Sequence, residues 1–179
     1  TQVFLGLDAA KSFFGGRATV LTGTPVRPEI KSRPTRGEAA ALFGLDPQKM
    51  TILVTGGSQG ARRLNELCAG AVAKFPEGIQ VLHIAGALDF DRVSQIAGAR
   101  ANHRVLGFCD QMPAAYAVAD LIISRSGASS LTEVSIAGLP SILVPFPYAA
   151  DDHQTRNAEV FERAGAAKLV QERDLDEGK

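Results

Sequence analysis

The chain has 179 residues, of which 45% are hydrophobic and 21% charged, and its formal net charge is +0. This balance excludes a disordered chain and a protein that attracts nucleic acid broadly by charge, and the length allows one core of ordinary size. Its two cysteines, Cys68 and Cys109, are far apart in sequence, which is typical of a reducing compartment and predicts neither a disulfide nor a zinc site. No apolar run reaches the roughly 18 residues that a membrane span needs, so any membrane contact is expected to be peripheral.

The first part of the chain is predicted to be the end of another domain. VFLGLDAAKSFF (3–14) predicts a helix, RATVL (17–21) a short strand, and TGTPVRPEI (22–30) a loop. One helix and one strand cannot close a core, so residues 1–30 are expected to be a remnant of an N-terminal domain with its interdomain connector. A second connector-like segment follows, in which Pro, Gly and charged residues flank one short helix.

From Met50 onward, apolar strands alternate with helices. The predicted strands are 51–56, 79–85, 104–108, 120–124, 141–146 and 166–170, and helices are expected to start near Ala61, Asp89, Met112, Ser130 and Asp152. This alternation predicts an α/β fold with a doubly wound, Rossmann-like parallel sheet and helices on both faces. We assign residues 31–172 to this domain and 173–179 to a C-terminal tail. Ligands are expected in the crevice outside the carboxyl ends of the strands.

The loop TGGSQGA (55–61) joins a strand to a helix. Glycines let the backbone approach a ligand, and the helix start presents free N–H groups, so an anion is the expected occupant. Gly60-Ala61-Arg62 replaces the G-K-[ST] of a phosphate-binding P-loop, and the second strand ends without the acid of a dinucleotide site. The alternative is a glycine-rich turn that only joins the two elements.

A second strand-to-helix loop, SRSGASSLTEVSIAGLP (124–140), faces the same crevice. Two helix starts on one edge suggest a diphosphate, and Glu133, about one turn into the helix, could accept both hydroxyls of a ribose. The alternative is a capping box, because Ser130 and Glu133 also fit the S-x-x-E pattern.

The third loop, VPFPYAADDHQTRNAEVF (144–161), carries polar side chains at a helix start. His153, Gln154 and Asn157 share one end of that helix and could converge on a polyhydroxylated ligand. In the alternative, Asp151 and Asp152 only complement the helix dipole and the other residues are solvated. No further spaced ligand set accompanies these residues, so no metal site is predicted.

Three further residues with side chains that could bind a ligand lie outside these loops. Arg27 in the connector could swing onto a phosphate or stay solvated. His83, in an apolar strand, is expected to be a core or sheet-edge residue, and His103 is expected in a solvated loop.

Taken together, GGSQGAR (56–62), FCDQMPAAYAVADLIISRSGASSLTE (108–133) and AGLPSILVPFPYAADDHQTRNA (137–158) closely resemble the donor-binding half of the MurG family. These bacterial B-type glycosyltransferases move N-acetylglucosamine from UDP onto a lipid-linked muramyl-pentapeptide and so make lipid II for peptidoglycan. The resemblance spans about residues 22 to 172, with TGTPVRPEI similar to the connector between the family's two Rossmann-like domains. Thr24 stands where that connector usually has Asn, and His153 stands at a variable position.

The resemblance implies a set of donor-binding residues. The diphosphate would lie against the glycine-rich loop, the start of the 128–133 helix segment and the connector arginine, while Glu133 would hold the ribose and the backbone of Cys109 the uracil edge. Gln154 and His153 would bind the sugar, with Asn157 supporting them. The implied substrate-binding residues are Arg27, Gly57, Ser58, Gln59, Gly60, Cys109, Ala128, Ser129, Ser130, Glu133, His153, Gln154 and Asn157.

The resemblance also implies what lies outside this chain. The catalytic base and the acceptor-binding loops would belong to the N-terminal domain, and neither a cofactor nor a metal is expected. The expected partners are UDP-N-acetylglucosamine, the lipid-linked acceptor and, peripherally, the cytoplasmic face of the bacterial inner membrane, with no nucleic acid. The alternatives are a nucleotide-sugar-binding subunit of a split glycosyltransferase, or another UDP-sugar glycolipid transferase.

Overall fold

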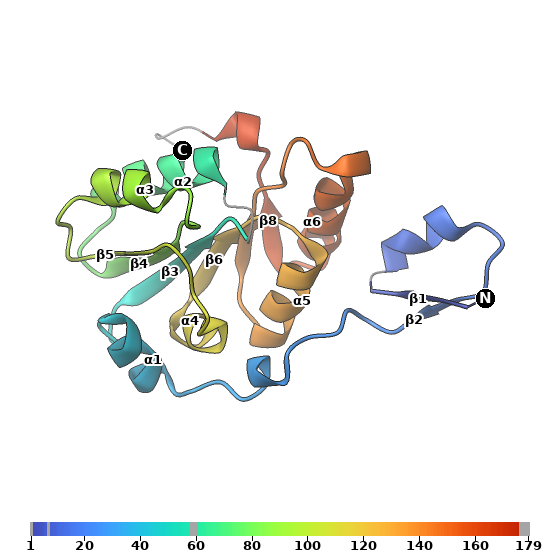
Figure 1. The fold of residues 1–179 in the computed structure, drawn as a ribbon, viewed down its shortest axis with the longest axis horizontal. Coiled ribbons are helices and arrows are strands. Elements are labelled where there is room, and N and C mark those ends of the chain that lie inside the picture. The colour runs from blue at the N-terminus through green and yellow to red at the C-terminus, as the bar shows by residue number, and fades with distance from the viewer. Residues whose placement is uncertain (1, 7, 58–60, 176–179) are drawn as a thin grey trace.

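A computed structural model describes residues 2–6, 8–57 and 61–175 of the chain. Its centre is a sheet of six strands in the order β5-β4-β3-β6-β7-β8, with every neighbouring pair parallel (Figure 1). The strands are β3 (Met50–Thr55), β4 (Ile79–Ile84), β5 (His103–Leu106), β6 (Leu121–Ser124), β7 (Ser141–Leu143) and β8 (Ala167–Leu169). The strand order reverses between β3 and β6, so the loops after these two strands open a crevice at the centre of the carboxyl edge.

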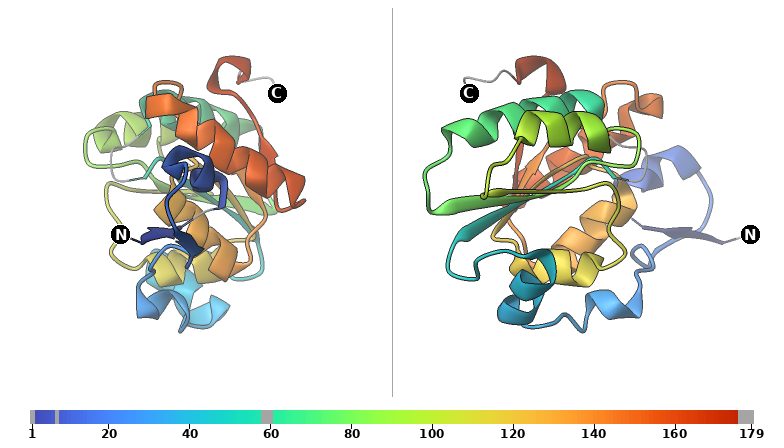
Figure 2. Two further views of the ribbon diagram at one scale, coloured as in Figure 1. Left: turned by 90° about the vertical axis from the view of Figure 1, so that its right-hand side faces the viewer. Right: turned by 60° about the vertical axis from the view of Figure 1, so that its left-hand side comes forward.

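Helices cover both faces of this sheet. They are α1 (Arg36–Phe43), α2 (Arg62–Ala71), α3 (Phe90–Ala97), α4 (Met112–Val118), α5 (Ala128–Ala137) and α6 (His153–Arg163). Figures 1 and 2 show α2 and α3 over one face, and α1, α4 and α5 over the other. Helix α6 packs through Ala158 against Leu131 of α5 and Leu143 of β7. The doubly wound α/β fold predicted from the sequence is confirmed.

The strands are apolar on both sides because both faces are buried. In β3, Leu53 belongs to the large core cluster with α1 and α4, whereas Ile52 and Val54 pack with Val72 on the α2 side. This alternation of two buried faces explains the nearly continuous apolar runs that marked these strands in the sequence.

The N-terminal segment differs from its prediction. Residues 3–14 do not form one helix: β1 (Val3–Leu5) pairs in parallel with β2 (Thr19–Leu21), and the 3-10 helix η1 (Asp8–Phe14) lies between them. The strands β1 (VFL) and β2 (TVL) consist mostly of β-branched and aromatic residues, which favour paired strands over a helix. This unit lies beside the main domain (Figure 1), and the guanidinium of Arg156 on α6 stacks 5.3 Å from the ring centroid of Phe13.

One alternative is excluded and one further expectation is corrected. Helix α5 begins at Ala128, so Ser130 lies inside the helix and the capping box proposed for Ser130 and Glu133 does not form. A capping box does form between Thr35 and Glu38 at the start of α1. His103 is not solvated: it is the first residue of β5 and is buried against His83.

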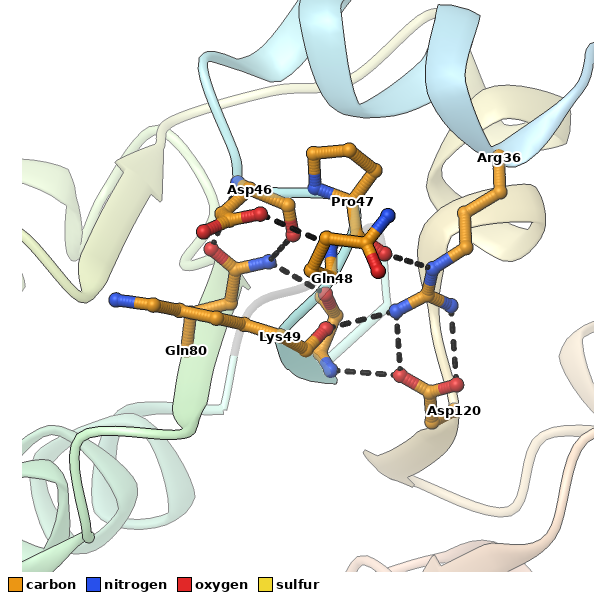
Figure 3. A network of polar contacts seen from close by, with 8 residues as sticks. Arg36, Asp46, Pro47, Gln48, Lys49, Gln80 and Asp120 are labelled. Carbon is orange, nitrogen blue, oxygen red and sulfur yellow. Dashed lines mark hydrogen bonds and ion pairs between the residues drawn. The ribbon is translucent and has the colours of Figure 1, made fainter.

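A polar network fastens α1 to the amino edge of the sheet (Figure 3). Arg36 donates to both carboxylate oxygens of Asp120, at 3.0 and 2.8 Å, and also to the carbonyls of Pro47 and Lys49. The same carboxylate accepts from the N–H of Thr51 at 2.7 Å. The network joins α1, β3 and the start of β6 at the edge opposite the crevice.

Two 3-10 segments flank the main domain: η2 (Pro28–Ile30) lies in the connector and η5 (Glu172–Asp174) follows β8. Two others, η3 (Val72–Lys74) and η4 (Ala150–Asp152), adjoin α2 and α6. In the described part of the chain, no helix combines the length and the apolar character that crossing a membrane requires.

Candidate functional site

A cavity of about 360 Å³ opens at the carboxyl edge of the sheet, where the crevice was predicted. Its walls come from the ends of β3, β4 and β5, from α4 and α5, and from the connector. The predicted residues in its lining are Arg27, Gly57, Cys109, Ser130 and Glu133. Five positions spread from residue 27 to residue 133 therefore meet at one place.

Gly57 forms the exit from β3. Its φ angle of +79° lies in the left-handed region that favours glycine, and its N–H donates to Thr55 Oγ1 at 3.3 Å. The predicted residues Ser58, Gln59 and Gly60 lie outside the described part of the chain.

Glu133 is the carboxylate of this cavity. Its Oε2 accepts a hydrogen bond from the Tyr116 hydroxyl at 2.9 Å, and its Oε1 lies 3.2 Å from Arg27 Nη2. The Glu133 side chain is 16% exposed. Since none of these bonds caps α5, Glu133 is free to act as an acceptor toward a ligand in the cavity.

The connector brings Arg27 to this place. Ile30, three residues on, is fully buried in the large core cluster, and Pro28 begins the 3-10 helix η2 between them. Arg27 itself is extended and its side chain is 53% exposed. A buried anchor and a half-exposed cationic side chain therefore lie close together in the chain.

Cys109 follows β5 in the wall of the same cavity. Burial raises the pKa of its thiol, so at neutral pH the group is an uncharged thiol rather than a nucleophilic thiolate. The residue is suited to shape the wall and to present its backbone, not to supply a charged sulfur.

Helix α5 begins without a side-chain cap. Its N-cap residue is Gly127, which has no side chain to accept from the first turn. The N–H groups of Ala128, Ser129 and Ser130 have no partner within the helix, and the positive end of the helix dipole lies beside them. An anion is the natural acceptor for such groups.

A second cavity, also of about 360 Å³, lies between the N-terminal unit and helices α5 and α6. It is lined by Gly6, Ala10, Phe13, Thr24, Ala128, His153, Arg156 and Asn157. His153 is exposed, and its Nδ1 lies 2.8 Å from the Ala150 carbonyl oxygen. Ser129 is exposed and lines neither of these two cavities.

Gln154 and Asn157 join the loop after β6 to the start of α6. Gln154 Oε1 accepts from the N–H groups of Ser126 and Phe146, at 3.3 and 3.0 Å. Asn157 Nδ2 donates to the Ser126 carbonyl at 3.1 Å. With its carbonyl oxygen used in this way, Gln154 retains its amide NH₂ group as a donor for a ligand.

The buried side chain of Arg125 connects the loop after β6 to the loop after β7. It is 8% exposed and donates to the carbonyls of Val144 and Pro145. It also forms an ion pair with Glu172. The loops after β6 and β7 are thus fixed to each other by buried polar contacts.

Two consecutive residues before α6 have unusual backbone geometry. Asp151 and Asp152 have φ angles of 50° and 52°, in the left-handed region that residues other than glycine rarely adopt. Asp152 Oδ1 accepts from the Thr155 hydroxyl at 2.6 Å, a contact within the first turn of α6. Among the described residues, no group of three His, Cys, Asp or Glu side chains is placed to hold a metal ion.

Sequence reasoning did not single out Tyr116, although it lies in the cavity wall and bonds Glu133. It is the one polar aromatic residue in the alanine-rich segment 113–119. A single phenol in a helix otherwise made of small apolar residues is the signal that could have identified it, because a buried tyrosine hydroxyl needs a partner.

Comparison with known proteins agrees with this geometry. Residues 51–179 match the model described as glycosyltransferase family 28 C-terminal domain. A Flavobacterium psychrophilum protein named UDP-N-acetylglucosamine--N-acetylmuramyl-(pentapeptide) pyrophosphoryl-undecaprenol N-acetylglucosamine transferase is 40% identical, over 98% of this chain and 48% of its own length. A Solibacter usitatus protein of the same name is 42% identical, over 98% of this chain and 47% of its own length.

Solved structures extend the comparison. The crystal structure of Acinetobacter baumannii MurG aligns with a TM-score of 0.75 at 29% identity, over 99% of this chain and 55% of that chain. WaaG, a glycosyltransferase involved in lipopolysaccharide biosynthesis, aligns with a TM-score of 0.64 at 17% identity, over 96% of this chain and 50% of that chain, and shows a shared fold. These matches confirm the predicted B-type glycosyltransferase fold.

The chain spans about half the length of the curated relatives that it matches. The family model covers residues 51–179, which is most of the chain, and the resemblance to MurG predicted from the sequence is confirmed. The chain therefore belongs to glycosyltransferase family 28 and contains the C-terminal domain of that family.

Proposed function

We propose that this chain is the donor-binding half of an inverting N-acetylglucosaminyltransferase that converts lipid I to lipid II in peptidoglycan synthesis. The observation that carries the proposal is the convergence on one crevice of Glu133, Arg27 and Ser130, which lies in the uncapped first turn of α5. A carboxylate, a guanidinium and free N–H groups are the chemistry that a nucleoside diphosphate requires. The names of relatives at 40% and 42% identity supply the sugar and the reaction.

In this proposal the donor lies along the carboxyl edge of the sheet. Glu133 accepts the ribose hydroxyls, and the backbone at Cys109 meets the uracil edge. The diphosphate lies against the glycine-rich loop and the N–H groups of Ala128, Ser129 and Ser130, with Arg27 approaching from the connector. The donor sugar extends toward the second cavity, which His153 and Asn157 line.

Two residues at the start of α6 then have distinct roles. Gln154 offers its amide NH₂ group to a sugar hydroxyl, because its carbonyl oxygen is occupied by the loop after β6. Asn157 supports the site indirectly, because its hydrogen bond to the Ser126 carbonyl fixes the loop after β6.

The reaction would be a direct displacement at the anomeric carbon. The acceptor hydroxyl, deprotonated by a base in the other half of the protein, attacks as the bond to UDP breaks. Negative charge then grows on the diphosphate, where the α5 dipole is already oriented to receive it and where Arg27 can move from Glu133 onto a phosphate. Preorganised dipoles of this kind require neither a cofactor nor a metal ion.

The proposal also divides the chain. Residues 1–30 are the end of the preceding domain with its connector, residues 31–172 bind the donor, and residues 173–179 are a tail. The acceptor, a lipid-linked muramyl-pentapeptide, would be held by the other half of the protein at the cytoplasmic face of the bacterial inner membrane. This chain alone would bind donor without transferring the sugar.

Amide chemical shifts of the ¹⁵N-labelled chain, recorded during a titration with UDP-N-acetylglucosamine, test this function. The expected shifts cluster at Gly57, Cys109 and residues 128–133, while α1 and Asp120 on the opposite edge stay unchanged. Shifts confined to any other surface, or none at millimolar donor, would contradict the proposal.

A further inference from the structure

Tyr116 links the core of the domain to the wall of the crevice. The residue is 2% exposed and belongs to the same buried cluster as Leu53, Ala115 and Val134. Its hydroxyl nevertheless lies in the cavity lining and donates to Glu133 Oε2 at 2.9 Å. The ring is fixed by packing on every side, so the position of the hydroxyl is fixed with it.

The protonation state of this hydroxyl is equally well defined. Burial, together with the negative charge of Glu133, raises the pKa of Tyr116 well above its ordinary value. The group therefore remains a phenol at every physiological pH and can only donate toward the carboxylate.

The two oxygens of Glu133 meet very different partners. Oε2 is held by the immobile Tyr116, whereas Oε1 contacts Arg27, whose side chain is 53% exposed. A carboxylate accepts about four hydrogen bonds, so two partners leave capacity for two further donors. A half-exposed ion pair is weak and a ligand can replace it at little cost.

We propose that Tyr116 is a positioning residue: it anchors Glu133 through Oε2, so that the remaining lone pairs face the cavity and receive the two ribose hydroxyls of the donor. This inference rests on the proposed function and adds to it the residue that makes the site selective for ribonucleotides. Without the anchor, Glu133 samples several rotamers, and binding a ribose must order the side chain.

The substitution Tyr116→Phe removes the hydroxyl oxygen of this residue and nothing else. In Tyr116→Phe the ring and its packing remain, and only the donor to Glu133 is lost. Affinity for UDP should fall about 3- to 10-fold, because part of the binding free energy is then spent on ordering the Glu133 side chain. Affinity for 2′,3′-dideoxy-UDP, which has no ribose hydroxyls, should change less than about twofold.

Tyr148→Phe is the matched control. Tyr148 is the other tyrosine of the chain, is 84% exposed and lies outside both cavities, so its loss should alter neither affinity. In the Glu133→Gln background, Tyr116→Phe should lose at least half of its effect on UDP binding, because the two side chains act as one unit.

The outcomes separate this inference from the function on which it rests. Equal weakening of both nucleotides by Tyr116→Phe, or no weakening of either, overturns the positioning role. If the unmodified chain binds UDP no better than 2′,3′-dideoxy-UDP, then Glu133 does not bind the ribose and the positioning role is overturned, whereas a chain that binds neither nucleotide overturns the proposed function itself.

Discussion

Arg27 and Glu133 are 106 positions apart in sequence, and Arg27 Nη2 lies 3.2 Å from Glu133 Oε1. The pair joins the connector to the first turns of α5 across the mouth of the crevice. Because one side chain is half exposed, the contact contributes about 0 to 1 kcal/mol to folding. Its significance lies in the two proposed ligand-binding groups that it keeps at one place.

Replacing Arg27 tests the phosphate role of the connector. Arg27→Gln should weaken the binding of UDP by about 1.5 kcal/mol, the value of one charge-assisted hydrogen bond. The binding of uridine, which has no phosphate, should be almost unaffected. Calorimetric titration with both ligands provides the comparison. Arg33→Gln, in the segment that follows the connector and outside the cavity, is the control. Equal losses for UDP and uridine would show that Arg27 does not contact phosphate.

Replacing Glu133 tests the ribose role. Glu133→Gln should weaken UDP binding by roughly 1.5 to 3 kcal/mol, because a charged acceptor of two hydroxyls is lost. The free energy of unfolding should change by less than about 1 kcal/mol, since α5 begins at Ala128 and loses no cap. Glu159→Gln, on the exposed side of α6, should change neither quantity. Unchanged UDP affinity would remove Glu133 from the site.

Most of the fold could be predicted from the sequence, because alternating apolar strands and amphipathic helices determine a parallel sheet and its crevice. The same reasoning failed at residues 3–14, where the partner of Val3–Leu5 is a strand that follows a 3-10 helix. It also failed at His103, which is buried as the first residue of β5 although the residues just before it are mostly polar or small. Pairing between strands that are far apart in the sequence cannot be recognised from the few residues around one position.

The candidate site could be predicted in part. The residues placed on loops after strands meet because parallel strands end at one edge, as shown by the shared cavity of Gly57, Cys109 and Glu133. The Tyr116 bond to Glu133 could not be foreseen, because the spacing between α4 and α5 depends on tertiary packing. The use of the Gln154 carbonyl oxygen by two loop N–H groups was hidden for the same reason.

His83 and His103 form a buried stacked pair with ring centroids 5.5 Å apart. Asn65 Nδ2 donates to the Ala85 carbonyl and to Asp89, so Asn65 Oδ1 must accept from His83 Nε2, 3.1 Å away. His83 Nδ1 is then an acceptor, and His103 Nε2 donates to it across 3.3 Å. For neutral rings, this pattern places the proton of each histidine on Nε2.

Acidification should destabilise this pair. Burial lowers the pKa of His83 to about 3 and that of His103 to about 4, from an ordinary value of 6.5. The unfolded chain binds more protons below pH 6.5, so the stabilisation is complete above that pH and is lost as the pH falls toward 4. Urea unfolding should show a loss of about 1 to 2 kcal/mol per histidine between pH 7 and pH 5.

The third histidine provides the control for this pH dependence. His153 is exposed, and His153→Gln should keep the full loss of stability between pH 7 and pH 5. His103→Gln should reduce the loss of stability between pH 7 and pH 5, whatever the effect of this substitution on stability at pH 7. An unchanged pH dependence in His103→Gln would show that another group is responsible.

The network around Arg36 and Asp120 should matter for stability alone. Asp120→Asn weakens the bidentate pair with Arg36 and the bond from the Thr51 N–H, and should lower the free energy of unfolding by about 1 to 2 kcal/mol. UDP affinity should stay within twofold of the unmodified chain, because this edge is opposite the crevice. A large loss of affinity in a folded variant would argue against that separation.

The most direct test of the central claim is calorimetric titration of the 179-residue chain with UDP-N-acetylglucosamine, UDP-glucose and NAD, each with and without magnesium. The account predicts that UDP-N-acetylglucosamine binds more tightly than UDP-glucose, that NAD does not bind, and that magnesium leaves the affinities unchanged. Equal binding of the two UDP-sugars, binding that requires magnesium, or no binding of UDP-N-acetylglucosamine would contradict it.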